Sequence, residues 1–165
     1  MRRLVGAVDK ERETLAQPNA IRTLLVDDSV EFLTGASLWI LERTDLVVVG
    51  KVRGGLRAIE AVGKLHPDLV IMDCVLPELD GFRVARMIKS RPNPPLVIIA
   101  TFATSQAARD EALAAGADGF IAKDEFAGGL ERLLDELLAP RGETAKTPTS
   151  RGTPARLGSR TEQDR

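Results

Sequence analysis

Five polar residues that could carry chemistry come at the ends of short apolar runs in this sequence. Asp27 and Asp28 follow the first run, Asp73 follows the third, Thr101 the fourth and Lys123 the fifth. Carboxylates brought together repel one another, and each resists ionisation unless a cation neutralises the site. Oxygen ligands of this kind suit Mg²⁺, which is usually held by one or two carboxylates together with waters and phosphate oxygens.

This set of side chains fits phosphoryl transfer to an aspartate. A carboxylate beside bound Mg²⁺ can attack a phosphoryl group and form an aspartyl-phosphate. Such a transfer requires mainly positioning and neutralisation of the charge on the phosphoryl oxygens. The metal would supply one positive charge and Lys123 a second, while the Thr101 hydroxyl would supply a hydrogen bond.

The apolar runs predict strands that are buried on both faces. The runs are largely continuous, with Arg22 and Thr23 inside the first, and polar residues bound them, which is typical of a parallel sheet. The expected strands span residues 21–26, 46–49, 70–72, 96–100 and 119–122.

The segments between these runs have helical spacing. Ser29 stands where the N-cap of the first helix is expected, and Pro67 follows the end of the second. The five strands alternate with five helices, which predicts a (βα)5 doubly wound α/β fold with a parallel five-stranded sheet over residues 21–139. In such a sheet, functional residues gather at the carboxyl ends of the strands, so we expect the polar side chains to converge there.

The near-neutral net charge of −1 hides an uneven distribution. Residues 1–20 form a polar N-terminal extension with four bases and three acids, whereas residues 21–139 carry 13 bases and 18 acids. Residues 140–165 carry six bases and three acids among prolines and glycines, which predicts a disordered basic tail. The single cysteine excludes an intrachain disulfide and a cysteine-based zinc cluster.

Composition also limits where the chain acts and what it binds. No apolar run is long enough for a membrane helix or an export signal, so we expect a cytoplasmic location. The tail is too short and too polar for a DNA-binding fold. We therefore expect a single stand-alone domain that does not bind nucleic acid or membrane directly. Its output would pass through contact with another protein.

Residues 21–139 resemble a response-regulator receiver domain, which has the flavodoxin-like (CheY-like) fold. The sequence Leu-Leu-Val-Asp-Asp ending at Asp28 resembles the acidic pair of that family, and Met-Asp-Cys-Val-Leu-Pro-Glu-Leu-Asp-Gly around Asp73 resembles its phosphoacceptor segment. Thr101 takes the position of the switch hydroxyl, and Phe120, three residues before Lys123, that of the switch aromatic. The segment Ala-Gly-Ala-Asp-Gly followed by Lys-Asp is similar to the NarL/FixJ-like branch, whose receivers are usually fused to helix-turn-helix domains.

The resemblance implies a role for each residue in the site. Asp73 would accept a phosphoryl group from a phosphohistidine of a sensor histidine kinase or a histidine phosphotransfer protein. Asp28, Asp73 and the backbone carbonyl of Val75 would bind Mg²⁺ directly, with Asp27 acting largely through water, and Lys123 would pair with the phosphoryl oxygens.

The resemblance also implies a switch. On phosphorylation, Thr101 would move toward the phosphate and Phe120 would turn inward, which would remodel the surface of the fourth helix, fifth strand and fifth helix. That surface would bind a downstream protein or a second copy of the chain. The domain would be a regulatory phosphoacceptor in a two-component system. The only reactions that it would catalyse are its own phosphorylation and dephosphorylation.

Two departures bear on access to the site and on phosphoryl lifetime. Phe102 is bulkier than the small residue that usually follows the switch hydroxyl, so it narrows access to the site. Val75 and Ala103 offer no polar group that could orient attacking water, which favours slow self-dephosphorylation.

Two other functions stay open at this point. One is a magnesium-dependent phosphohydrolase with an aspartate nucleophile, although such enzymes carry Asp-x-Asp and residue 75 is valine. The other is a receiver-like scaffold with an idle site, although the complete set of five residues argues against it.

Overall fold

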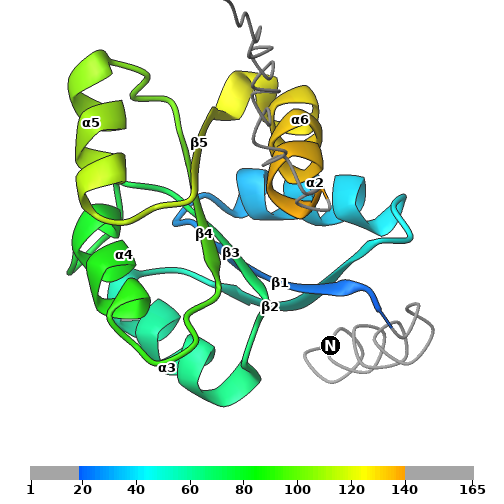
Figure 1. Cartoon of the computed structure of the whole chain (residues 1–165), viewed down its shortest axis with the longest axis horizontal. Coiled ribbons are helices and arrows are strands. Elements are labelled where there is room, and N and C mark those ends of the chain that lie inside the picture. Colours follow the sequence, from blue (N-terminus) through cyan, green and yellow to red (C-terminus); the bar gives the residue numbers. More distant parts are fainter. Residues whose placement is uncertain (1–18, 140–165) are drawn as a thin grey trace, which may run out of the picture.

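Five apolar segments pair in parallel into one sheet with the strand order β2-β1-β3-β4-β5. The computed structural model describes residues 19–139 (Figure 1). The predicted parallel five-stranded sheet is therefore confirmed. The strands are β1 (Ile21–Val26), β2 (Leu46–Val52), β3 (Leu69–Met72), β4 (Leu96–Thr101) and β5 (Gly119–Ala122).

Helices cover both faces of this sheet. One face is covered by α2 and α6 and the other by α3, α4 and α5, as Figure 1 shows. A short 3-10 helix, η1, joins β5 directly to α6. The helices are α2 (Val30–Leu41), α3 (Gly55–Leu65), α4 (Gly81–Lys89), α5 (Gln106–Ala114), η1 (Lys123–Glu125) and α6 (Phe126–Leu138).

Alternate residues of the inner strands enter two separate cores. Leu24 and Val26 pack under α3, α4 and α5, whereas Leu25 packs under α2 and α6. The same alternation places Met72 in the first core and Ile71 in the second. Full burial of each such side chain contributes about 1.5–3 kcal/mol. Because both faces of the inner strands are covered, Leu24–Val26 of β1, all of β3 and most of β4 are continuous apolar runs and not alternating ones.

Polar side chains cap the N-terminal ends of several helices. The Ser29 side chain accepts a hydrogen bond from the Phe32 N–H, which confirms the predicted N-cap of α2. The Asp80 side chain accepts a hydrogen bond from the Arg83 N–H and so caps α4. These caps satisfy backbone donors that the first helical turn leaves without partners.

Strand β2 runs to Val52, beyond the predicted end at residue 49. Gly50 and Lys51 interrupt the apolar run, but β2 is an edge strand that pairs only with β1, so its residues need less burial than those of inner strands. The pairing of β1 with β2 also shifts register between Thr23 and Leu24. An interrupted apolar run therefore still forms a strand when it lies at the edge.

Some expectations lie outside the described residues. The predicted N-terminal extension falls on residues 1–18 apart from its last two positions, and the predicted basic tail is residues 140–165. Within residues 19–139, no helix is long and apolar enough to cross a membrane.

Gly81 allows the chain after β3 to fold back tightly against Asp73. Its N–H donates a hydrogen bond of 2.9 Å to the Cys74 carbonyl oxygen. A Cβ atom at position 81 would lie 2.1 Å from the Asp73 carbonyl oxygen and 2.8 Å from the Cys74 Cα. Both are backbone atoms of the segment that carries Asp73, so neither can move aside without displacing that residue.

Replacement of two glycines is expected to change stability in opposite directions. Gly81→Ala should lower the free energy of unfolding by about 2 kcal/mol or more, because the methyl group overlaps backbone. Gly35→Ala, within α2, should raise it by about 0.5–1 kcal/mol, because a Cβ there meets nothing within 4 Å and alanine favours the helix. Urea unfolding measures both changes, and a Gly81→Ala variant as stable as wild type would contradict the tight packing at this turn.

Candidate functional site

The carboxyl ends of two strands bring together the acidic residues that the sequence singles out. Asp27 and Asp28 follow β1, and Asp73 follows its neighbour β3. The three side chains each place a carboxylate oxygen within 4.8 Å of the others. Asp27 and Asp73 are buried, whereas Asp28 is exposed.

Lys123 lies between two of these carboxylates. Its Nζ is 2.6 Å from Asp27 Oδ2 and 2.5 Å from Asp73 Oδ2. All three side chains are buried, with 3% of Lys123, none of Asp27 and 8% of Asp73 exposed. The rings of Phe32 and Phe102 lie 4.6 and 5.3 Å from the same Nζ, within cation–π range.

The electrostatic surroundings keep this lysine charged. Burial alone would lower the pKa of Lys123, but its contacts with Asp27 and Asp73 outweigh that effect, and the pKa ends above its usual value. Burial raises the pKa of Asp27, against the lowering effect of Lys123 and of the Ser29 N–H. The cluster has three carboxylates and one ammonium group, which contacts two of them, so it retains formal negative charge.

Local turns orient the two buried carboxylates. Asp27 Oδ1 accepts a hydrogen bond of 2.9 Å from the Ser29 N–H, and Asp73 Oδ1 accepts one of 3.0 Å from the Val75 N–H. Aspartate commonly bonds the backbone two residues ahead in this way. In each residue the turn holds one oxygen, and the other oxygen lies against Lys123.

The donor set fits a hard divalent cation. Asp27 Oδ2 is buried against the Lys123 ammonium at 2.6 Å, but that ion pair is not aligned as a hydrogen bond. Buried polar atoms without a hydrogen bond are rare in folded proteins, and a bound water or ion is one explanation for such an atom. Oxygen ligands with excess negative charge are those that Mg²⁺ prefers.

Thr101, the last residue of β4, lies at the same edge of the sheet and is 1% exposed. Its Oγ1 accepts hydrogen bonds from the Ala103 N–H at 3.2 Å and from the Cys74 thiol at 3.1 Å. Cys74 is buried, and the contact of its thiol with Thr101 has no signal in the spacing of two residues so far apart.

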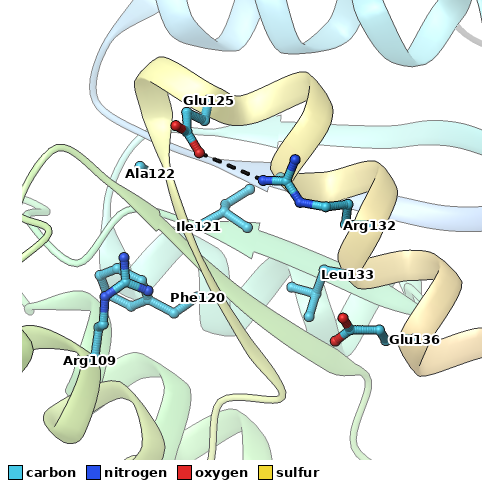
Figure 2. A pocket seen from close by; sticks show the side chains of 9 residues that line it. Arg109, Phe120, Ile121, Ala122, Glu125, Arg132, Leu133 and Glu136 are labelled. Atoms are coloured by element: carbon cyan, nitrogen blue, oxygen red, sulfur yellow. Dashed lines mark ion pairs between the residues drawn. The ribbon is translucent and has the colours of Figure 1, made fainter.

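Phe120 lies on β5 in a different environment. It lines a hollow of about 230 Å³ that is bounded by α5, β5 and α6, shown in Figure 2. The guanidinium of Arg109, on α5, lies 4.6 Å from the centre of its ring. Across the hollow, Arg132 pairs with Glu125 at 3.6 Å.

Two further residues border the carboxylates. Val75 is in the loop after Asp73, with 66% of its surface exposed. Phe102 follows Thr101 and is 72% exposed, although its ring lies close to Lys123. Both apolar side chains therefore face solvent beside a charged site.

Comparison with known proteins places this geometry in a family. The family model for the response regulator receiver domain matches residues 23–135. A protein-glutamate methylesterase/protein-glutamine glutaminase of Alkalilimnicola ehrlichii is 33% identical over 156 residues, which are 88% of this chain and 40% of that protein. The chain thus spans less than half the length of this curated relative.

Solved structures agree with this result. The response regulator domain of Thermotoga maritima CheB is 29% identical with a TM-score of 0.66, over 73% of this chain and 98% of that one. A LuxR-family two-component response regulator of Aurantimonas sp. SI85-9A1 is 28% identical with a TM-score of 0.68, over 73% of this chain and 86% of that one. The family match covers more than half of the chain, and the flavodoxin-like sheet is the one these neighbours share. The chain therefore belongs to the response regulator receiver domain family of two-component signalling.

Proposed function

We propose that this domain is a magnesium-dependent phosphoacceptor in which Asp73 receives a phosphoryl group from a phosphohistidine. The donor would be a sensor histidine kinase or a histidine phosphotransfer protein in the cytoplasm. The observation that carries the proposal is the position of the Lys123 Nζ, in contact with Asp73 and beside two further carboxylates.

The transfer would form one bond and break another. A carboxylate oxygen of Asp73 attacks phosphorus while the bond from phosphorus to the histidine nitrogen breaks, and the electron pair of that bond returns to the imidazole. Lys123, already against Asp73 Oδ2, is placed to pair with a phosphoryl oxygen after transfer. Mg²⁺ would be held by Asp28, Asp73 and the Val75 carbonyl, with Asp27 acting largely through water, and it supplies positive charge to the phosphoryl oxygens.

Output would pass through Thr101 and Phe120. Phosphorylation adds charge at one end of the sheet, and a two-state element can convert such a local change into a surface change. Thr101 would move toward the phosphoryl group and Phe120 would turn inward. That movement would change the hollow between α5, β5 and α6, which Phe120 and Arg109 line.

This altered surface would bind a downstream protein or a second copy of the chain. We propose that the domain makes no direct contact with nucleic acid or membrane. The role is regulatory, and the domain would act as an enzyme only in its own phosphorylation and dephosphorylation.

Two alternatives are less well supported. A phosphohydrolase of the Asp-x-Asp type needs an acid two residues after its nucleophile, and that position is the exposed, apolar Val75. An idle scaffold would have no use for three clustered carboxylates beside a single ammonium group, because uncompensated charge at a partly buried site is costly.

The phosphoacceptor role is tested by incubating the chain with acetyl phosphate and Mg²⁺. Intact-mass spectrometry should show one phosphoryl group per chain in wild type and none in Asp73→Asn, and chelation of Mg²⁺ by EDTA should abolish labelling. Asp110→Asn, which changes an exposed aspartate on α5, is the matched control and should label as wild type does. Equal labelling of Asp73→Asn would contradict the assignment of the acceptor, and continuous turnover of phosphoesters would favour the phosphohydrolase.

The phosphoryl group on Asp73 is expected to be lost slowly. Val75 and Ala103 are both exposed at the rim of the site and offer no side-chain polar atom to orient water. Removal of phosphodonor followed by mass spectrometry should show label that persists for minutes or longer. Val75→Asn should speed its loss about threefold or more by positioning a water molecule, whereas Val75→Ala should not. Loss of label from wild type within seconds would rule this prediction out.

A further inference from the structure

The thiol of Cys74 contacts the hydroxyl of Thr101 inside the protein. Sγ and Oγ1 are 3.1 Å apart, and the two residues are 6% and 1% exposed. Cys74 is the residue directly after Asp73, and Thr101 ends the neighbouring strand β4. The contact therefore joins the proposed acceptor segment to the proposed switch residue.

This contact helps to fix where the Thr101 hydroxyl lies. Oγ1 accepts from the Cys74 thiol and from the Ala103 N–H, and a hydroxyl oxygen has two lone pairs. Both lone pairs are therefore occupied. Within residues 19–139, no hydrogen bond joins Thr101 to Asp73, so the hydroxyl is held against Cys74 and not against the acceptor.

The thiol itself cannot shift easily. The Cys74 carbonyl is bound by the Gly81 N–H, and a Cβ at position 81 would already overlap the Cys74 Cα. The side chain packs in the core under α3, α4 and α5.

We propose that Cys74 is a positioning residue that holds the Thr101 hydroxyl in its resting place. Thr101 must then release the thiol before it can approach a phosphoryl group on Asp73. A thiol is a weak donor, whereas a hydrogen bond to a charged phosphoryl oxygen is strong, so the exchange favours release only when the phosphoryl group is present. This role rests on the proposed function and adds to it a residue that sets how readily the switch responds.

The test uses beryllofluoride with Mg²⁺ as the probe, because this complex mimics a phosphoryl group on a carboxylate. Its dissociation constant is measured with the full chain. Cys74→Ala removes the hydrogen bond to Thr101, which the wild-type protein would have to break on binding the probe. Beryllofluoride should therefore bind about two- to fivefold more tightly, as expected for one modest hydrogen bond. Cys74→Ser keeps a donor and should stay close to wild type.

A double-mutant cycle separates positioning from general packing. In a Thr101→Val background there is no hydroxyl to hold, so Cys74→Ala should leave the dissociation constant unchanged. In addition, NMR of the resting protein should show one Thr101 side-chain rotamer in wild type and rotamer averaging in Cys74→Ala.

The outcomes separate this role from the function on which it rests. Wild-type protein that fails to bind beryllofluoride would overturn the proposed function and the role of Cys74 together. If wild type binds, unchanged or weaker binding by Cys74→Ala would overturn the role of Cys74 alone. A gain that persists in the Thr101→Val background would do the same, because it would show that Cys74 acts through packing.

Discussion

The ammonium group of Lys123, buried between Asp27 and Asp73, is the interaction on which this end of the molecule depends. Without it, the buried carboxylates at the ends of β1 and β3 would repel one another with no positive charge between them. A buried charge is costly to desolvate, and only close partners offset that cost. Strand β4 lies between β3 and β5, so the side chain after β5 must be long to reach Asp73. A lysine side chain is both positively charged and long enough.

The sheet provides the fixed frame for these contacts. Leu24–Val26 of β1 and the apolar residues of β3 and β4 bury both faces of the sheet, and the polar residues of the site come at the carboxyl ends of these strands. The caps and turns then orient individual atoms, such as the Ser29 N–H against Asp27 and the Val75 N–H against Asp73. The resulting cluster of like charges opposes stability, a compromise that is common at functional sites.

Much of this arrangement could be predicted from the sequence, because each element depends on a local pattern. The run that ends at Val26 predicts a buried strand, and its end predicts where Asp27 lies. The predicted end of β2 at residue 49 was wrong. Gly50 and Lys51 break the apolar run there, but an edge strand does not need a continuous apolar run. The contact of Cys74 with Thr101 was missed because it depends on side-chain positions in the loop after β3 and at the end of β4. Family membership is confirmed, while the roles of the individual site residues stay predictions.

The role of Lys123 is tested most directly by urea unfolding of wild type and Lys123→Met with and without Mg²⁺. Methionine fills similar space without charge, and Lys51→Met, at an exposed position on β2, is the matched control. We expect Lys123→Met to lose about 2–4 kcal/mol of stability in the absence of Mg²⁺, because two buried carboxylates lose their counter-charge. Added Mg²⁺ should then stabilise this variant more than wild type, since the ion takes over the neutralisation. A Lys123→Met protein as stable as wild type, with the same response to Mg²⁺, would contradict the central place of this ion pair.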